Sequence, residues 1–269
     1  MAIHGAKSAF PLTDSGGAAA RPLVAATSGT WRQAIIERIV VETPTVKSFV
    51  LRPLVGAPLL PGQHVDVRLT AADGYQARRS YSVTSSPQTM GTIELAVELL
   101  DDGEVSTFLH TVAQVGDSVE VSDAHAEHFV WRSEDAGDVL LIGGGAGVAP
   151  LMSILRHRAQ IQTAHTMVLL YSARSWAEVI YREELLALER SQPGLRVIFC
   201  LTREPAQRPT DFSRRIDAEI VRGALSSLSS LPFLTFICGA NRFVGDVADV
   251  LLSLGLSPSS IRTERFGGS

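Results

Sequence analysis

Short runs in which hydrophobic and polar residues alternate fill the first half of the chain. This alternation is typical of β-strands that bury one face, and between residues 92 and 98 it groups Ile93, Leu95 and Val97. Turn-forming pairs such as Pro61-Gly62 separate the runs. Because no long helix intervenes, the pattern predicts an antiparallel barrel or sandwich, and we expect the six-stranded β-barrel form. Strands are expected at 33–41, 46–51, 63–69, 80–84 and 92–98, and one short helix at 106–113.

After Trp131 the pattern changes to strands that alternate with helices. This order predicts an α/β Rossmann-like domain, because parallel strands need crossover connections. We expect a disordered tail at residues 1–29, rich in Ala, Gly, Ser and Thr, a barrel domain at 30–134 and an α/β domain at 135–269. The expected strands are 139–142, 167–171, 197–201, 234–238 and one near Arg262, and the expected helices are 148–160, 177–190, 214–221 and 243–252.

The composition of the 269-residue chain excludes several classes of protein. A net charge of -4 provides no basic surface for a nucleic-acid backbone, so we expect no nucleic-acid partner. Cys200 and Cys238 are too few for a disulfide framework or a four-thiolate zinc or iron-sulfur site. The apolar runs are far shorter than the roughly 20 residues of a spanning helix, and no secretion signal is recognised. We expect a cytoplasmic monomer.

Residues 143–150 read Gly-Gly-Gly-Ala-Gly-Val-Ala-Pro and join a predicted buried strand to a predicted helix. Gly144, Gly145 and Gly147 let the backbone approach a pyrophosphate, which the oriented N–H groups of the helix N-terminus attract. Pro150 fits the first helical turn, where its missing N–H costs no hydrogen bond. The segment predicts nucleotide binding, and a tight turn without a ligand is the alternative.

In the predicted barrel, residues 79–82 read Arg-Ser-Tyr-Ser. Alternation along a strand sends Arg79 and Tyr81 to one face, where a guanidinium beside an aromatic ring suits a phosphate and a planar ring system. Ser80 and Ser82 face the other way at first sight. Taken alone, this segment favours the alternative in which Arg79 pairs with an acid and Tyr81 packs in the core.

A set of motifs, however, occurs in the order and spacing of one family. The motifs are residues 79–82, 103–107 (Gly-Glu-Val-Ser-Thr), 143–150, 238–239 (Cys-Gly) and 264–266 (Glu-Arg-Phe). From about Trp31 to its end the chain resembles the ferredoxin-NADP reductase superfamily, in the two-domain form without an iron-sulfur domain. The resemblance implies that Arg79 binds a flavin phosphate, that Tyr81 stacks on the isoalloxazine and that Ser82 bonds near flavin N5.

The segment that begins at Gly103 favours FAD over FMN. Ser106 or Thr107 is expected to cap the short helix, whose free N–H groups would meet the diphosphate that only FAD contains. A plain helix cap without a ligand is the alternative. The expected flavin contacts in this part of the barrel also include Ser80, Val97 and Val105.

The last two motifs are expected at the site of hydride transfer. By the resemblance, Cys238 and the adjacent Gly239 lie beside the nicotinamide, while Glu264 and Phe266 reach back to the flavin edge. A buried thiol that only packs is the alternative for Cys238. Together with Ser82, Cys238 and Glu264 are the expected catalytic residues.

Two loops after predicted parallel strands favour NADPH as the hydride donor, with NADH as the alternative. Thr202 and Arg203 resemble the Ser-Arg pair of members that use NADPH, and Arg174 follows the preceding strand. A hydroxyl beside an arginine suits the 2′-phosphate, whereas NAD sites more often place an acid on the ribose. Surface arginines without this role are the alternative.

The sequence departs from the family pattern at two places. Where Gly-Pro-x-Gly is usual before Phe129, it has Asp-Ala-His-Ala at residues 123–126, and Ala240 replaces a proline after Gly239. His125 and His128 lie three residues apart with no third ligand assigned, which is more typical of surface residues than of a metal site. We expect no metal.

The sequence therefore predicts a flavin-dependent NAD(P)H oxidoreductase that reduces FAD and passes electrons to a separate acceptor, for instance an iron-sulfur or haem protein. A free-flavin or ferric reductase, and a subunit active only within a larger complex, are the alternatives. For an acidic acceptor, a local basic patch is expected to offset the net charge. Its candidate residues are Arg52, Arg68, Arg78 and Arg79.

Overall fold

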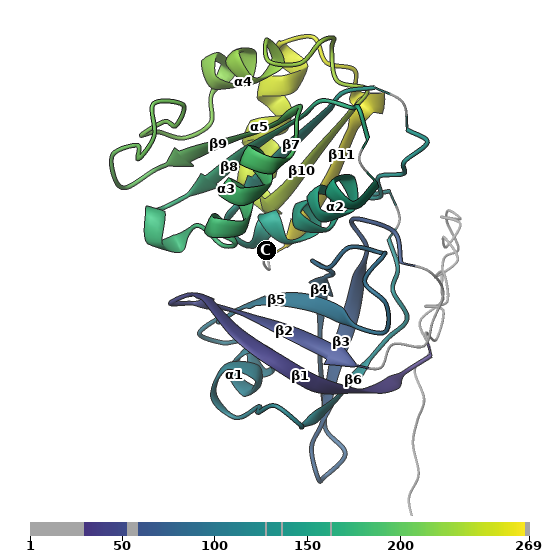
Figure 1. The fold of residues 1–269 in the computed structure, drawn as a ribbon. Helices are drawn as coiled ribbons and strands as arrows, with labels where there is room; N and C mark the ends of the chain where they lie inside the picture. Colours follow the sequence, from purple (N-terminus) through teal and green to yellow (C-terminus); the bar gives the residue numbers. More distant parts are fainter. Residues whose placement is uncertain (1–29, 53–58, 127, 136, 162, 267–269) are drawn as a thin grey trace, which may run out of the picture.

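The computed structural model describes residues 30–52, 59–126, 128–135, 137–161 and 163–266, so the tail expected at 1–29 lies outside the described residues. One antiparallel and one parallel sheet form two domains that face each other (Figure 1). Within the described part of the chain, no helix is long and apolar enough to cross a membrane.

The first sheet is six-stranded and antiparallel, with the order β4-β3-β6-β1-β2-β5. An isolated bridge between Val83 and Leu95 joins the two ends and closes the barrel. Helix α1 (Glu104–Thr111) adds Val105 and Leu109 to the barrel core. The strands are β1 (Arg32–Thr43), β2 (Val46–Arg52), β3 (His64–Thr70), β4 (Gln76–Ser82), β5 (Ile93–Glu98) and β6 (Ser118–Val121).

Three details of the barrel differ from the prediction. Strand β4 begins at Gln76 rather than 80, because its first half pairs with β3 in an exposed hairpin that needs no apolar alternation. Strand β6, only four residues long, was not assigned although it lies between β1 and β3. Ser106 and Thr107 do not cap α1. Gly103 is the N-cap, and the Ser106 hydroxyl donates back to its carbonyl at 3.0 Å.

The second sheet is parallel, with the order β11-β10-β7-β8-β9. Helices α2 and α3 pack on one face of this sheet, and α4 and α5 on the other. The strands are β7 (Val139–Gly144), β8 (Met167–Ala173), β9 (Leu195–Leu201), β10 (Leu234–Ala240) and β11 (Ile261–Phe266). The helices are α2 (Val148–Ile161), α3 (Arg182–Ser191), α4 (Ala218–Leu225) and α5 (Asn241–Ser253), with short 3-10 turns at Gly145–Gly147, Trp176–Glu178 and Pro258–Ser260.

Two helices begin later than predicted. Asp217 caps α4 by accepting from the backbone N–H groups of Glu219 and Ile220, so the helix cannot start at 214. The helix expected at 177–190 is divided by Tyr181, which has a left-handed backbone conformation with φ of 55°. That conformation turns the Tyr181 side chain out of the helical path and into the boundary between the domains.

A buried polar network joins the two domains around Arg156 of α2. Its guanidinium donates to both carboxylate oxygens of Glu184 at 2.7 and 2.6 Å, and to Glu94 of the barrel at 2.9 Å. The Tyr181 hydroxyl donates to the same Glu94 at 2.9 Å and bonds Ser48 at 2.8 Å. Burial lowers the pKa of Arg156, but Glu184 and Glu94 outweigh it, so the net pKa is raised and the guanidinium stays charged.

Replacing Arg156 tests the importance of this network. Arg156→Met leaves Glu94 nearly buried without its cation, and removing one partner of such a pair costs about 3 to 5 kcal/mol when burial is complete. Since the Arg156 side chain is 16% exposed, we expect a loss of about 2 to 4 kcal/mol in the free energy of unfolding, measured by urea denaturation.

Arg196→Met is the matched control, because the exposed Arg196 makes one hydrogen bond to Ser227. It should change stability by less than about 0.5 kcal/mol. Adding Glu94→Gln to Arg156→Met should recover part of the loss by removing the stranded charge. Equal losses for the Arg156 and Arg196 variants would contradict the assigned role.

Candidate functional site

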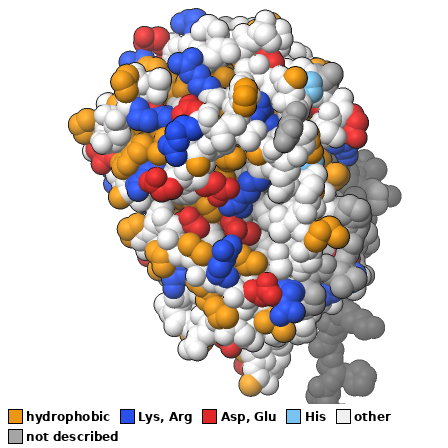
Figure 2. Space-filling model, viewed as in Figure 1, with side chains coloured by type: hydrophobic (Ala, Val, Ile, Leu, Met, Phe, Trp, Pro, Cys, Tyr) orange, Lys and Arg blue, Asp and Glu red, His pale blue; other side chains and the backbone are white. Residues whose placement is uncertain are grey.

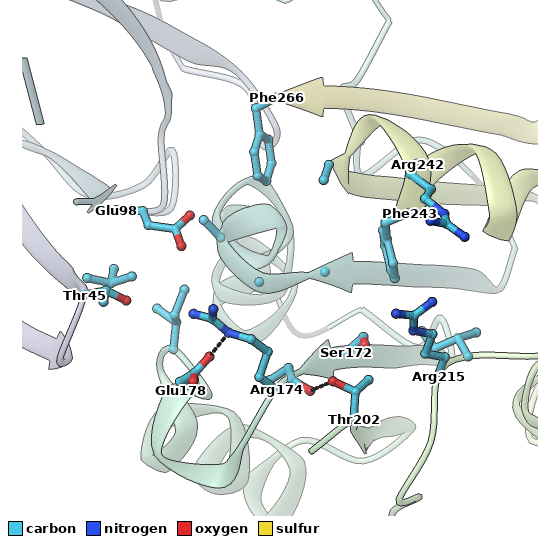
Figure 3. Close-up of a pocket in the computed structure, with 18 of the residues that line it drawn as sticks. Thr45, Glu98, Ser172, Arg174, Glu178, Thr202, Arg215, Arg242, Phe243 and Phe266 are labelled. Atoms are coloured by element: carbon cyan, nitrogen blue, oxygen red, sulfur yellow. Dashed lines mark hydrogen bonds and ion pairs between the residues drawn. The ribbon is translucent and has the colours of Figure 1, made fainter. Parts of the chain in front are cut away.

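A cleft of about 470 Å³ opens between the domains at the carboxyl ends of the parallel strands. Thr45 and Glu98 line it from the barrel, and Phe266 lines it from the end of β11 (Figure 3). Basic and acidic side chains gather along the domain boundary on this face of the molecule (Figure 2). The cleft lies where the connections from β7 and β10 leave in opposite directions, which is where open α/β sheets bind ligands.

The glycine-rich loop forms one wall of the cleft. Gly144 and Gly145 line it directly, and Gly145 has φ of +55°, which glycine adopts without strain. A Cβ atom on Gly147 would lie 2.1 Å from the carbonyl oxygen of Cys238, so only glycine permits this approach of the loop to β10. Pro150 is buried in the first turn of α2. The loop therefore offers backbone and a helix N-terminus to an elongated anionic ligand.

Arginine side chains collect at the end of the cleft away from the barrel. Figure 3 places Arg215 and Arg242 on either side of Phe243, near Ser172 and Thr202. Arg242 forms an exposed ion pair with Asp246 at 3.6 Å. Arg215, by contrast, has no acidic partner among the residues that the structure describes. Its guanidinium is thus available for an anionic group of a ligand.

The three residues expected to select the nucleotide differ in their placement. Thr202 lines the cleft and donates to the Ala173 carbonyl at 3.3 Å, while Arg174 lines it with its charge already paired to Glu178 at 2.5 Å. Arg203 is exposed and does not line the cleft, although its backbone N–H donates to the Arg174 carbonyl.

Sequence reasoning missed other residues of the cleft. Most of them lie in loops or at the ends of strands and helices, and only the fold brings these distant positions together. Besides Arg215 and Arg242, they include Thr43, Thr45, Val46, Glu98, Phe243 and Asp246.

On the barrel, β4 presents Arg79 and Tyr81 close together. Arg79 is exposed, and its guanidinium donates to the Arg78 carbonyl at 2.8 Å. Burial raises the pKa of Tyr81 to about 12, and the nearby charge of Arg79 opposes this shift. Ser80 instead faces β3 and donates to Asp66 at 2.5 Å. A guanidinium free of acidic partners among the described residues and an adjacent half-buried ring fit a phosphate and an aromatic ligand.

The N-terminus of α1 fits a diphosphate through its backbone. No side chain caps the helix, and the Glu104 carboxylate accepts from the Tyr75 hydroxyl at 2.9 Å. The first-turn N–H groups have no intrahelical partners, as at any helix start. Val97 and Val105 are fully buried in the barrel core, and Ser106, 2% exposed, bonds through its hydroxyl to the turn that precedes α1. These three residues therefore offer almost no accessible surface to a ligand. Thr107 lies in the same helix.

The residues expected at the reaction site meet across the domain boundary. The Ser82 hydroxyl, at the end of β4, donates to Glu264 of β11 at 3.2 Å, and Glu264 lies opposite Cys238 in the β10–β11 pairing. Burial raises the pKa of Glu264 to about 7, against the bond from Ser82 and the charge of His125. Burial also raises the pKa of Cys238 well above its usual value, and Glu264 adds to the shift.

The arginines expected to form a basic patch are largely paired with acids. Arg68 donates to both carboxylate oxygens of Glu120, at 2.9 and 2.8 Å, and Arg78 lies 3.8 Å from Asp66. Arg52 is paired with Glu37. The positive charge available to an approaching partner is therefore smaller than the sequence indicates.

Two family models match the chain, and their boundaries follow the two domains. The oxidoreductase FAD-binding domain matches residues 43–128, and the oxidoreductase NAD-binding domain matches residues 141–249.

Individual relatives and a solved structure are also similar to this chain over most of its length. The chain is 30% identical over 251 residues to a flavohemoprotein of Rhizobium meliloti, covering 88% of this chain and 60% of the relative. It is 30% identical over 240 residues to the glycine betaine monooxygenase reductase subunit of Chromohalobacter salexigens, covering 86% and 63%. The chain thus spans less than two thirds of the length of these relatives. A ferredoxin NADP+ reductase structure from Neisseria gonorrhoeae with bound FAD and NADP is similar with 25% identity and a TM-score of 0.74, covering 87% and 98%.

The raised pKa of Glu264 predicts a pH-dependent contribution to stability. The folded state releases this proton near pH 7 and an unfolded chain near 4.5, so the contribution is present below about pH 4.5 and is lost as the pH rises through 7. Glu264→Gln lacks the ionisation. The free energy of unfolding of the variant, relative to that of the original chain, should rise by about 1 to 2 kcal/mol between pH 5 and pH 8, after allowance for solvent screening.

Urea denaturation at the two pH values measures this difference. Glu183→Gln is the control, because Glu183 is 80% exposed and should show no comparable gain. A pH response of Glu264→Gln that matches the original chain would disprove the prediction.

Proposed function

Because the chain belongs to the ferredoxin-NADP reductase superfamily of FAD- and NAD-binding oxidoreductases, we propose that it transfers hydride from NADPH to FAD and then passes electrons to a separate acceptor. The observation that carries the proposal is the hydrogen bond from Ser82 to Glu264, which joins a residue of each domain beside Cys238. It brings the expected flavin and nicotinamide sites to one point at the domain boundary.

FAD would be held by groups from three parts of the barrel. Arg79 supplies an exposed guanidinium for a phosphate, and Tyr81 supplies a half-buried ring for the isoalloxazine. The N-terminus of α1, which has no side-chain cap, supplies N–H groups for the diphosphate. When bound, FAD accepts hydride from the nicotinamide and releases electrons in turn.

The remaining chemistry depends on the charge of Glu264. An ionised Glu264 takes the single O–H of Ser82 and leaves the Ser82 oxygen to accept a hydrogen bond from the ligand. A protonated Glu264 can donate to Ser82 and frees the Ser82 O–H for a ligand acceptor. Glu264 thereby sets whether Ser82 donates or accepts at the flavin edge. Cys238, held protonated by burial, fills the position beside the nicotinamide without adding charge.

We place the acceptor outside the described chain. The glycine betaine monooxygenase reductase subunit is named as part of a larger system, which supports a role as the reductase of another protein. The paired state of Arg52, Arg68 and Arg78 supports an acceptor that needs little positive charge for docking. We propose that this acceptor is an iron-sulfur or haem protein.

The test begins with the cofactor. The purified chain should be yellow and release FAD, identified by mass spectrometry, at about one per chain, and anaerobic NADPH should bleach it. Arg79→Ala should retain less FAD than the control Arg38→Ala, which changes a barrel arginine of β1. Release of FMN alone, or no flavin after reconstitution with FAD, would contradict the proposal and favour a reductase that uses free flavin as substrate.

A panel of acceptors then completes the test. Steady NADPH turnover by the isolated chain with an artificial acceptor would argue against a subunit that works only within a complex.

The preference for NADPH is tested at Arg215. Arg215 lines the cleft beside Thr202 without an acidic partner among the described residues, and a lost charge-assisted hydrogen bond costs about 1.5 to 3 kcal/mol. Arg215→Ala should therefore lower kcat/KM for NADPH about ten-fold or more while sparing NADH. Arg203, the candidate that the sequence favoured, provides the matched comparison. Arg203→Ala should lose less of its kcat/KM for NADPH, because Arg203 does not line the cleft.

Stopped-flow reduction with each nucleotide provides the measurement. Equal losses for NADPH and NADH would exclude contact with the 2′-phosphate. A larger loss for Arg203→Ala would reverse the assignment within the cleft.

A further inference from the structure

We propose that Tyr181 is a positioning residue that ties the two domains together at the barrel end of the cleft and thereby sets how closely the nicotinamide approaches the flavin. The inference deepens the proposed function, on which its catalytic meaning rests. The tie itself involves residues of this chain alone, so it can also be measured without a ligand.

Tyr181 belongs to the α/β domain, yet its hydroxyl makes its hydrogen bonds with the barrel. It donates to Glu94 of β5 at 2.9 Å and lies 2.8 Å from the Ser48 hydroxyl and 3.2 Å from the Thr84 hydroxyl. The Glu94 carboxylate takes the single phenol proton, which leaves the phenol oxygen as an acceptor for Ser48. Since Tyr181 is only 5% exposed, these bonds are shielded from water.

The backbone of Tyr181 is strained in the position that makes this contact. Its φ of 55° lies in the left-handed region, and among the described residues it is the only residue other than glycine with a positive φ. A bulky residue keeps such a conformation only where its surroundings hold it there. Here they are the hydrogen bonds to the barrel and the guanidinium of Arg156, which lies 4.8 Å from the centre of the Tyr181 ring. The helical path is thus interrupted at the residue that reaches the barrel.

Two walls of the cleft adjoin this contact. On the α/β side, Ile180 precedes Tyr181 and lines the cleft, and its N–H donates to the Tyr171 hydroxyl at 3.2 Å. On the barrel side, Val46 lines the cleft two positions before Ser48, on the same face of β2. The hydrogen bond between Tyr181 and Ser48 therefore limits how far these two walls can move apart.

This end of the cleft is where the proposed function needs a precise spacing. Arg215 and Arg242 lie at the other end, so the nicotinamide half of the nucleotide would lie toward the barrel, where Figure 3 shows Thr45 and Phe266. Reacting atoms must approach to about 3 to 3.5 Å, and a misplacement of about 1 Å can cost roughly a hundred-fold in rate. The Tyr181 contact should therefore govern the rate of hydride transfer more than the affinity for the nucleotide.

Tyr181→Phe keeps the ring and removes only the hydroxyl. In stopped-flow experiments with saturating NADPH, the limiting rate of flavin reduction should fall about ten-fold, a part of the loss that a misplacement of about 1 Å can cause. The dissociation constant for adenosine 2′,5′-bisphosphate, which lacks the nicotinamide, should change by less than about two-fold in calorimetry. A residue that only stabilised the fold would not slow the limiting rate while sparing this affinity.

Ser229→Ala is the matched control. The Ser229 hydroxyl also donates to a carboxylate, that of Asp138 at 2.7 Å, but inside the α/β domain and outside the cleft, so the limiting rate should not change. Ser48→Ala removes a barrel partner of Tyr181 and should also slow flavin reduction. Because both substitutions break one contact, the loss in the double variant should be smaller than the product of the two single losses.

A distance measurement separates this inference from the proposed function. Val112→Cys at the end of α1 and Glu183→Cys in α3 place spin labels at exposed positions of the two domains, and both native cysteines are buried. In pulsed electron paramagnetic resonance of the full chain, Tyr181→Phe should broaden the distribution of distances between the labels, whereas Ser229→Ala should not.

An unchanged limiting rate in Tyr181→Phe, or a distance distribution as narrow as that of the original chain, would overturn the inference. Failure of the proposed function appears differently. In that case the distribution broadens in Tyr181→Phe, while NADPH reduces no flavin in the original chain.

Discussion

The ion pairs of Arg156, a largely buried arginine, with Glu94 and Glu184 are the interaction on which the arrangement of the two domains depends. It belongs to α2, the helix that begins at the glycine-rich loop, yet it binds Glu94 of the barrel and Glu184 of α3 together. A charge so enclosed is stable only when its partners remain in place. The network therefore helps to hold the barrel against the α/β domain, and the cleft lies between these two domains.

Ser82 and Glu264 illustrate what this fixed position provides. Ser82 ends a strand of the barrel, and Glu264 belongs to the last strand of the parallel sheet. Each gains its partner only because the two domains meet. Held 3.2 Å apart, they become a pair whose shared proton decides which of them donates. Burial disfavours the ionised carboxylate, and it thereby raises the pKa of Glu264 into the neutral range.

The sequence predicted the features that depend on local patterns. Alternation identified five barrel strands, and the glycines before α2 marked a loop that lines the cleft. Strand β6 was missed because four residues carry too little pattern. The division of the helix at Tyr181 was missed because neither the left-handed backbone of Tyr181 nor its hydrogen bond to the distant Glu94 leaves a mark in the local sequence pattern. The sequence also could not show which arginines line the cleft. Arg203 and Arg215 look alike in sequence, and only the fold separates an exposed side chain from one that lines the cleft.

The burial of Cys238 determines how readily its thiol can be oxidised. The thiolate, rather than the thiol, is the form that peroxide oxidises to sulfenic acid and beyond. Cys238 is fully buried between the glycine-rich loop and β11, and its environment strongly disfavours the thiolate. Oxidation of Cys238 therefore requires an opening of the fold that exposes its sulfur atom, so the thiol is protected for as long as this part of the parallel sheet stays closed.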